Sequence, residues 1–269
     1  MDNRLIELKQ DPAAFIEKEI KAFVLTAPEN RLPHFNNEPI FEEPLVGYAS
    51  GADPLFAEYK RIIGPHHLTP QEVIEAATGQ RLPPESLTVV CWVLPLALEN
   101  RLANRRQKEL PALRWAHARY YSDALMEALR KHIIGLLTKQ GHMAVASVRS
   151  SAFKTFDLNG VRTSNWSERH ALYAAGLGTF SLADTMITPK GMAMRCGTIT
   201  TDMVIPPSLR TATNHMGNCL FFADGSCRRC IERCPSGAIT EKGHNKAICR
   251  HHLQDELRPI FKGKYGWEY

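Results

Sequence analysis

Five of the seven cysteines of this 269-residue chain lie between Cys219 and Cys249, and three of them stand two and three residues apart. Such crowding suits either a disulfide framework or a metal site, and the redox state of the compartment separates the two. The N-terminus, MDNRLIELKQDPAAFIEKEI, is charged throughout and is typical of an amphipathic helix rather than a signal peptide. We therefore predict a cytoplasmic protein, in which thiols stay reduced and a cysteine cluster binds metal.

The spacing of these cysteines favours an iron–sulfur cluster. The run Cys227-x2-Cys230-x3-Cys234, followed by proline, reproduces the last three cysteines and the proline of the bacterial ferredoxin pattern C-x2-C-x2-C-x3-C-P. Asp224 occupies the position of the first cysteine in that pattern, and Cys219 is the expected substitute. Structural zinc is the alternative, although zinc ribbons usually pair two CxxC units. We predict one or two [4Fe-4S] clusters here.

Cys249, in the segment NKAICRHHL, is a further candidate ligand. A lone cysteine is often a small buried residue, but after a ferredoxin-type run a ligand role is expected. The last cysteine of such a run serves the other of two clusters. Cys249 is therefore expected to share a cluster with Cys234. Cys219 is expected to share the other cluster with Cys227 and Cys230. His251 and His252 could also ligate, but two exposed helical histidines are the simpler expectation.

The number of cysteines leaves the number of clusters open. Two four-iron clusters need eight ligands, and the five cysteines named above leave three of those positions to be filled. One possibility is a single cluster that takes four of the five thiols. The other is a pair of clusters completed by a further cysteine motif after Tyr269.

Charge is concentrated in the same region. Residues 206–269 contain ten Lys or Arg and six Asp or Glu, so +4 of the formal net charge of +5 lies there. A basic surface favours an anionic partner, and we expect an acidic electron donor such as a ferredoxin or flavodoxin. No basic motif interleaved with aromatic residues predicts binding to nucleic acid. The longest apolar run, Leu87 to Leu98, is too short to span a bilayer, so no membrane partner is expected.

Hydrophobic periodicity predicts helices alternating with apolar strands, which indicates an α/β domain up to about Ile205. Buried strands are expected over 86–96 and 142–148, and a hairpin is expected around Pro189–Gly191, whereas residues 27–54 are expected to be irregular. Helices are predicted over residues 1–24, 70–79, 112–141 and 166–178. The second of these has Thr69 as its cap and Gly79 as its stop signal.

The triplet PPS, which begins at Pro206, breaks the last strand and starts the basic, cysteine-rich region. We therefore predict two domains. Residues 1–205 form the α/β domain, and residues 206–269 form a small ferredoxin-like α+β iron–sulfur domain.

Two segments together resemble epoxyqueuosine reductases and their relatives, the reductive dehalogenases. They are SERHALYAAGLGTFSLADTMITPKGMAMRCGTITTDMVIPPS and the cysteine run GSCRRCIERCPSGAI, and the similarity extends over roughly residues 85–250. The resemblance implies that the first domain is nitroreductase-like and binds a corrinoid. It also implies an oxidoreductase that contains cobalamin as well as iron–sulfur clusters.

The resemblance also implies roles for individual residues. Arg169, in the ER pair, would hold a phosphate or propionamide edge of the corrinoid, and Gly176 and Gly178 would let the backbone approach this large ligand. A surface salt bridge for Arg169, and a helix C-cap for the glycines, are the alternatives.

Arg162 stands where the sequence departs from the family. Epoxyqueuosine reductases have an acidic residue, taken to be the proton donor, at the position six residues before the ER pair, which here is Arg162. Arginine cannot donate a proton at neutral pH, but it could bind an anionic substrate or leaving group. We therefore predict a cobalamin-dependent reductase whose small-molecule substrate is not epoxyqueuosine. The alternative is an electron-transfer protein that reduces the corrinoid of a partner.

Overall fold

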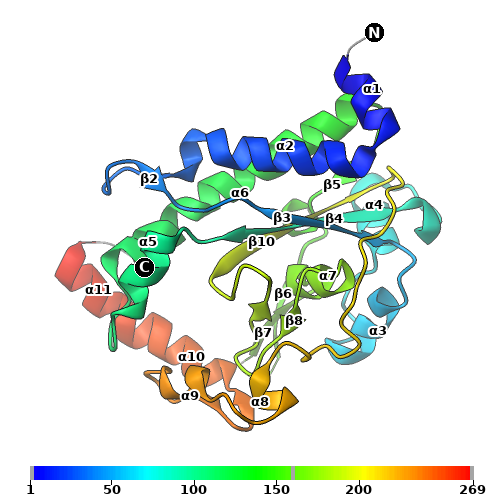
Figure 1. Cartoon of the computed structure of the whole chain (residues 1–269). Helices are drawn as coiled ribbons and strands as arrows, with labels where there is room; N and C mark the ends of the chain where they lie inside the picture. Colours follow the sequence, from blue (N-terminus) through cyan, green and yellow to red (C-terminus); the bar gives the residue numbers. More distant parts are fainter. Residues whose placement is uncertain (1–2, 159–160, 267–269) are drawn as a thin grey trace.

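A four-stranded antiparallel sheet, with the strand order β3-β4-β10-β5, forms the centre of the computed structural model, which describes residues 3–158 and 161–266 (Figure 1). All eight residues of β4 (Thr88–Pro95) are buried, which confirms the strand predicted there. β4 pairs with β10 (Met194–Thr201) along its whole length. β3 (Leu45–Ser50) and β5 (Ala144–Val145) are the outer strands.

Successive residues of β4 point into two different cores, because side chains alternate along a strand. Trp92 and its neighbours on one face pack against α2 (Pro12–Thr26) and α6 (Leu113–Lys139), which lie above the sheet in Figure 1. Cys91 and its neighbours on the other face pack against α7 (Glu168–Ala174). Helices therefore cover both faces, and the predicted mixed α/β class is confirmed.

Short elements surround this centre. None of the helices within residues 3–158 and 161–266 is both long enough and apolar enough to cross a membrane. The short helices around the central sheet are α1 (Asn3–Gln10), α3 (Leu55–Ile62), α4 (Pro70–Thr78) and α5 (Leu98–Arg105). The 3-10 turns are η1 (Pro28–Asn30), η2 (Pro84–Ser86) and η3 (Ser147–Arg149). The short strand pairs are β1 (Arg31–Leu32) with β2 (Glu38–Pro39), β6 (Thr155–Leu158) with β7 (Val161–Ser164), and β8 (Thr179–Phe180) with β9 (Met186–Ile187).

Local sequence sets where the helices begin and end. At the start of α4, Thr69 Oγ1 accepts a hydrogen bond from the Glu72 amide at 3.3 Å, and the Glu72 carboxylate accepts one from the Thr69 amide at 2.8 Å. This is a capping box, which satisfies two amides that the helix leaves unpaired. α4 then ends at Gly79, whose φ of 75° is left-handed. The start and stop signals predicted for this helix are confirmed.

The buried strand expected over 142–148 is only the two-residue edge strand β5, and both of its residues are half-buried. Two further predictions about strands were wrong. Residues 27–54, expected to be irregular, contain β3, which pairs with β4 from Leu45↔Val93 to Ser50↔Thr88. The hairpin expected around Pro189–Gly191 is only a local turn, because β10 pairs with β4 and β5 while β9 pairs with β8. Pairing with distant strands decides both cases, and a local pattern does not report it.

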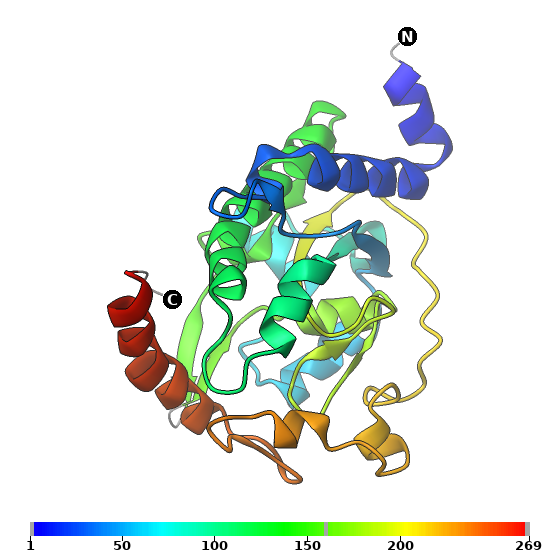
Figure 2. The same cartoon turned by 60° about the vertical axis from the view of Figure 1, so that its left-hand side comes forward.

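The chain leaves the sheet after Ile205 and continues as the tail, defined here as residues 206–266. Ser208 bonds twice to Tyr48 at the edge of β3: its amide donates to the Tyr48 carbonyl, and its hydroxyl accepts from the Tyr48 amide, both at 2.9 Å. The tail then runs down one side of the molecule and passes below the sheet (Figures 1 and 2). Its elements are α8 (Leu220–Ala223), α9 (Arg229–Glu232), β11 (Ile239–Thr240), β12 (Gly243–His244), α10 (Lys246–His251), a π-helix (His252–Leu257) and α11 (Arg258–Tyr265).

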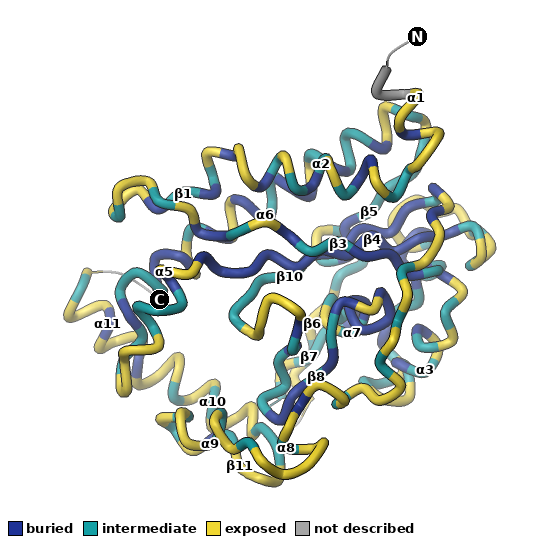
Figure 3. The backbone as a smooth tube through the Cα atoms, in the orientation of Figure 1, coloured by how far each residue is buried: buried dark blue, intermediate teal, exposed yellow. Residues whose placement is uncertain are grey.

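The tail has almost no apolar core of its own, as the exposed colouring in Figure 3 shows. Its buried residues are Cys219, Ala238, Leu257 and Phe261. So few buried residues give the tail little hydrophobic stabilisation of its own, and small domains commonly add disulfides or a structural metal. The predicted start of a separate domain at residue 206 remains a prediction.

The contact between Gly197 and Trp92 leads to a test of the sheet packing. A Cβ atom added to Gly197 would lie 2.5 Å from the Trp92 ring, which is fully buried. We expect Gly197→Ala to lower the free energy of unfolding by about 1–3 kcal/mol, because the ring must move within a packed core. Urea denaturation measures the change.

Gly135→Ala is the matched control for this test. Gly135 lies in α6, and no atom would lie within 4 Å of an added Cβ. This substitution should leave stability unchanged or raise it by up to about 1 kcal/mol. Equal unfolding midpoints for Gly197→Ala and the original chain would contradict the packing described.

Candidate functional site

Cys230 lies within electrostatic range of two other cysteines of the tail, Cys219 and Cys227. Cys219 is buried at the N-terminal end of α8, Cys230 lies in α9, and Cys227 lies between these two helices. Burial raises the pKa of the Cys230 thiol, and the nearby Cys219 and Cys227 thiols raise it further. The three thiolates would repel one another, and a bound cation would remove this repulsion.

Cys234 and Cys249 form a second set. Both line a cavity of about 220 Å³, which Trp115 and His252 also line. Burial raises the pKa of Cys249, and the Cys234 thiol adds to this. At Cys234 the effect of burial is outweighed by hydrogen bonds from Ser236 and from backbone amides, which lower the pKa. Cys234 is therefore held in a setting that favours the thiolate, the form that binds metal.

Cys230 is thus near Cys219 and Cys227, and Cys249 is near Cys234. The grouping of these cysteines into two ligand sets remains a prediction. Within the described ranges, no three His, Cys, Asp or Glu side chains converge tightly enough to hold a single metal ion. Cysteines provide the soft sulfur donors that an iron–sulfur cluster requires once they are deprotonated, and the tail has few other groups to order it. The residues therefore fit such a cluster, and their role as ligands remains a prediction.

Arg162 and Arg169, both singled out by the sequence, line one cavity of about 520 Å³ together with Lys246 of the tail and His170. A neighbouring cavity of about 390 Å³ is lined by the same three cations and also by Cys249. Positive charge therefore surrounds a space that reaches one of the candidate metal ligands. Such a space favours an anionic occupant.

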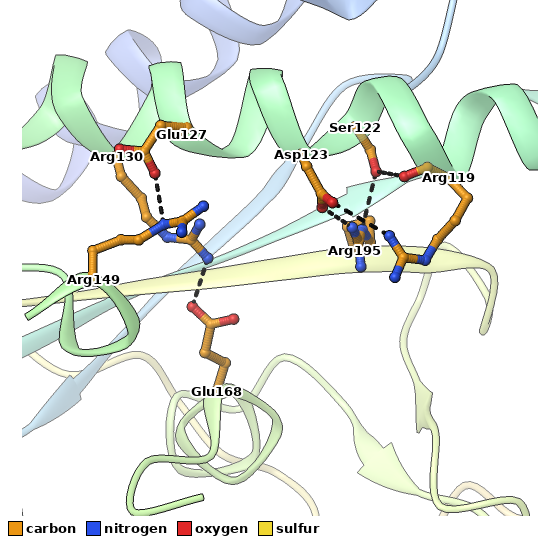
Figure 4. Close-up of polar contacts among 8 residues, drawn as sticks. All are labelled: Arg119, Ser122, Asp123, Glu127, Arg130, Arg149, Glu168 and Arg195. Carbon is orange, nitrogen blue, oxygen red and sulfur yellow. Dashed lines mark hydrogen bonds and ion pairs between the residues drawn. The ribbon is translucent and has the colours of Figure 1, made fainter. Parts of the chain in front are cut away.

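A third cavity, of about 450 Å³, adjoins the other two at Arg169. Its charged wall lies between α6, β10 and α7, as Figure 4 shows in part. Four arginines outnumber two carboxylates on this wall, so its formal charge is positive. The charged residues are Asp123, Arg130, Arg149, Glu168, Arg169 and Arg195, and the methionines are Met126, Met186, Met192 and Met194.

Carboxylates and a hydroxyl of α6 hold two of these arginines in place (Figure 4). Arg195 donates to the Asp123 carboxylate and, at 3.2 Å, to the Ser122 hydroxyl. Arg149 Nε lies 2.7 Å from the Glu127 carboxylate. These partners fix the guanidinium groups against the helix, so little ordering is left for a ligand to impose.

Glu168 is a buried carboxyl at the N-terminal end of α7. Its Oε1 accepts hydrogen bonds from Arg130 Nη2 at 3.0 Å and from the Thr198 amide at 3.1 Å, and the Arg130 and Glu168 side chains are 8% and 17% exposed (Figure 4). Burial raises the pKa of Glu168, and the Arg130 charge offsets only part of this. Burial also raises the pKa of Cys196, on the same wall, to about 12, so this thiol stays protonated. The wall therefore contains a carboxyl whose pKa lies above that of a free glutamate and a thiol that stays protonated.

Two histidines, the buried His67 and the half-buried His170, fix the start of α7, which carries both Glu168 and Arg169. His67 Nε2 accepts a hydrogen bond from the Ser167 amide at 3.2 Å, and Ser167 Oγ lies 2.7 Å from His170 Nδ1. Burial lowers the pKa of His67 to about 4 and that of His170 to about 3. Both imidazoles are therefore neutral near pH 7, and they position α7 without adding charge.

Gly176 and Gly178 face the chain's own backbone. Gly176 has a φ of 72° just after α7, which confirms the helix C-cap expected as the alternative there. Added Cβ atoms would lie 2.6 Å from the Leu209 carbonyl and 2.4 Å from the Ile187 carbonyl, respectively. Neither glycine lines the three cavities. The residues expected beside a corrinoid therefore match a ligand cavity only at Arg169.

Sequence reasoning missed the pairing of Arg130 with Glu168. These residues are 38 positions apart, and no spacing rule connects them. A signal was present in α6, where Arg130 lies next to Leu129 and three residues before Ile133, both of which are buried. A charged residue on the buried stripe of a helix usually has a buried partner.

The buried histidines predict how stability depends on pH. In the unfolded chain each would have a pKa near 6.5, so below that pH the unfolded state binds more protons than the folded state. The free energy of unfolding should be largest above pH 6.5 and fall as the pH is lowered. The expected loss between about pH 7 and about pH 5 is about 2 kcal/mol per histidine, measured by urea denaturation at each pH.

His170→Phe should make this pH dependence shallower, because it removes one of the two depressed groups. His251→Ala, which changes an exposed histidine, is the control and should keep the full slope. An unchanged slope in His170→Phe would show that this histidine is not the group responsible.

Comparison with family models of known proteins finds no match for this chain. Solved structures do match. A catabolic reductive dehalogenase is 16% identical over 80% of this chain, with a TM-score of 0.51. A reductive dehalogenase whose structure suggests a mechanism for B12-dependent dehalogenation is 16% identical over 80% of this chain, with a TM-score of 0.50. An epoxyqueuosine reductase is 15% identical over 94% of this chain, with a TM-score of 0.48.

This chain spans 28% of the length of those two dehalogenases and 61% of the length of that epoxyqueuosine reductase. The reductive dehalogenases among these structural neighbours are one of the two kinds of protein named by the sequence resemblance. At these identities the likeness concerns the fold. Over 80% of its length, this chain has the fold of the matching 28% of the reductive dehalogenases.

Proposed function

We propose that this chain is an iron–sulfur oxidoreductase that passes electrons from its tail to an anionic ligand bound between Arg162 and Arg169. The observation that carries the proposal is the cavity of about 390 Å³, because Arg162, Arg169 and Cys249 all line it. A ligand held by the two arginines would lie beside a candidate cluster ligand. Short separation is what single-electron transfer through a protein needs.

The tail cysteines are the proposed metal ligands. A bound [4Fe-4S] cluster would supply electrons one at a time. Cys219, Cys227 and Cys230 would hold one cluster, and Cys234 and Cys249 would contribute to a second. The basic surface of the tail would receive the acidic electron donor, because opposite charges speed the encounter of redox partners.

The arginine-lined cavities would bind and orient the ligand. Arg162, Arg169 and Lys246 offer three cations to an anionic group, and the methionines of the adjoining cavity offer apolar, polarizable contacts. Arg162 cannot supply a proton. Glu168, in the adjoining cavity, is the carboxyl that could hold and release one there.

A corrinoid is the ligand that the resemblance suggests, and one structural neighbour is described with B12-dependent chemistry. A small anionic substrate is the other candidate class. A protein that only carried electrons to a partner would need neither three adjoining cavities nor the buried pair of Arg130 and Glu168. These features favour an enzyme with its own ligand over an electron carrier.

The first test is of the metal centre. Anaerobically reconstituted protein should contain iron and acid-labile sulfide, with a broad absorbance near the visible–ultraviolet boundary that dithionite bleaches. Cys230→Ala should lose the iron of its set, whereas Cys91→Ala should keep all of it, because Cys91 is buried in the sheet core. About four irons per chain would indicate one cluster and about eight would indicate two. Bound zinc without sulfide would refute the proposal.

The second test is of ligand binding, with hydroxocobalamin as the probe in equilibrium dialysis on cluster-loaded protein. If the corrinoid occupies the cavities, Arg169→Ala should weaken binding by roughly tenfold or more, the usual effect of losing one charge-assisted contact. Arg61→Ala is the control, because Arg61 is 76% exposed and lines none of the three cavities. No binding at concentrations on the order of tens of micromolar would exclude the corrinoid and favour the carrier.

A further inference from the structure

The π-helix of the tail carries His252 into the cavity that Cys234 and Cys249 line. It continues directly from α10, the helix that contains Cys249. A π-helical turn costs stability relative to an α-helix, and such turns occur frequently at functional sites. The turn therefore places an imidazole beside two candidate metal ligands.

The environments of the two adjacent histidines differ sharply. The side chain of His251 is 65% exposed, and its Nδ1 lies 2.8 Å from the Asp255 carboxylate. The side chain of His252 is only 15% exposed. The sequence-based expectation of two exposed helical histidines is therefore confirmed for His251 and wrong for His252.

The hydrogen bonding of His252 leaves one ring nitrogen available. Its Nδ1 lies 2.5 Å from the Glu256 carboxylate, which accepts hydrogen bonds when it is ionised. In the neutral imidazole this contact places the proton on Nδ1 and leaves the lone pair on Nε2. Nε2 is buried and has no hydrogen-bond partner among the described residues. A buried polar atom without a partner is costly unless something binds it.

We propose that His252 Nε2 is a third protein ligand, with Cys234 and Cys249, of the metal centre at this cavity. The inference rests on the proposed function, because it assumes that the two thiolates hold an iron–sulfur cluster. The arrangement has the features of a metal-binding histidine, in which a carboxylate on one ring nitrogen orients the other toward the metal. Glu256 is the orienting carboxylate.

A histidine ligand changes the properties expected of the cluster. Imidazole is an established ligand of iron, and in proteins where it replaces thiolate at a cluster the reduction potential is raised. A neutral ligand in place of an anionic one leaves less negative charge on the cluster, so an electron is added more readily. The centre at Cys234 and Cys249 should therefore have a higher potential than a centre with thiolate ligands alone.

Pulsed electron paramagnetic resonance of the reduced, reconstituted full chain tests the assignment directly. We expect a strongly coupled nitrogen whose splitting changes when the protein contains histidine labelled with nitrogen-15. His252→Ala should lose this signal, while His251→Ala, its adjacent and exposed counterpart, should keep it. Circular dichroism of both variants checks that the α/β part is still folded.

The possible failures are distinguishable. A cluster with full iron and sulfide but no coupled nitrogen would overturn the role of His252 and leave the proposed function standing. A coupled nitrogen that persists in His252→Ala would also overturn it, because another group would then be the ligand. A chain that assembles no cluster at all would overturn both proposals.

Discussion

The pairing of β4 with β10 is the interaction on which the rest of the structure depends. The two strands run side by side over their whole length, and helices bury both faces of the ribbon that they form. Arg195 and Cys196, near one end of β10, line the cavity of about 450 Å³. The other end of β10 leads into the tail, where Ser208 is tied to the edge of the sheet. The strand β10 therefore connects the cavity of about 450 Å³ with the tail, which carries the five clustered cysteines.

The start of α7 is the second fixed point, because two consecutive residues there serve different cavities. Glu168 turns inward to Arg130 and to the backbone of β10, while Arg169 lies where the three cavities meet. The neutral histidines at Ser167 hold this end of the helix without placing a competing charge beside the carboxyl. Glu168 and Arg169 therefore have different settings, because one is paired with Arg130 in a largely buried position and the other is open to the cavities. In the proposed function, Arg169 would bind the anionic ligand and Glu168 would lie in the adjoining cavity.

Features with a local cause could be predicted from the sequence, and features produced by long-range contacts could not. The buried strand β4 and the caps of α4 follow from short patterns. The cysteine sets inferred from the ferredoxin pattern remain a prediction. β3 was missed because its six residues form a strand only through pairing with β4. The partnership of Arg130 with Glu168 was missed because it joins residues of two helices that are 38 positions apart. The burial of His252 was missed because it comes from tertiary packing, which a local pattern does not report. Gly176 and Gly178 lie close to the chain's own backbone, and their role beside a corrinoid remains a prediction.

The tail has few buried residues, so its cysteines are the groups best able to order it when they bind metal. Its position below the sheet, next to the cavity of Arg162 and Arg169, has a functional meaning only if metal is bound there. Anomalous X-ray diffraction at the iron edge, from crystals of anaerobically reconstituted protein, measures this most directly. The account predicts iron beside the tail cysteines. At least one iron centre should lie next to Cys249 and the cavity that Arg162 and Arg169 line. Iron located elsewhere, or a signal at the zinc edge with none at the iron edge, would contradict it.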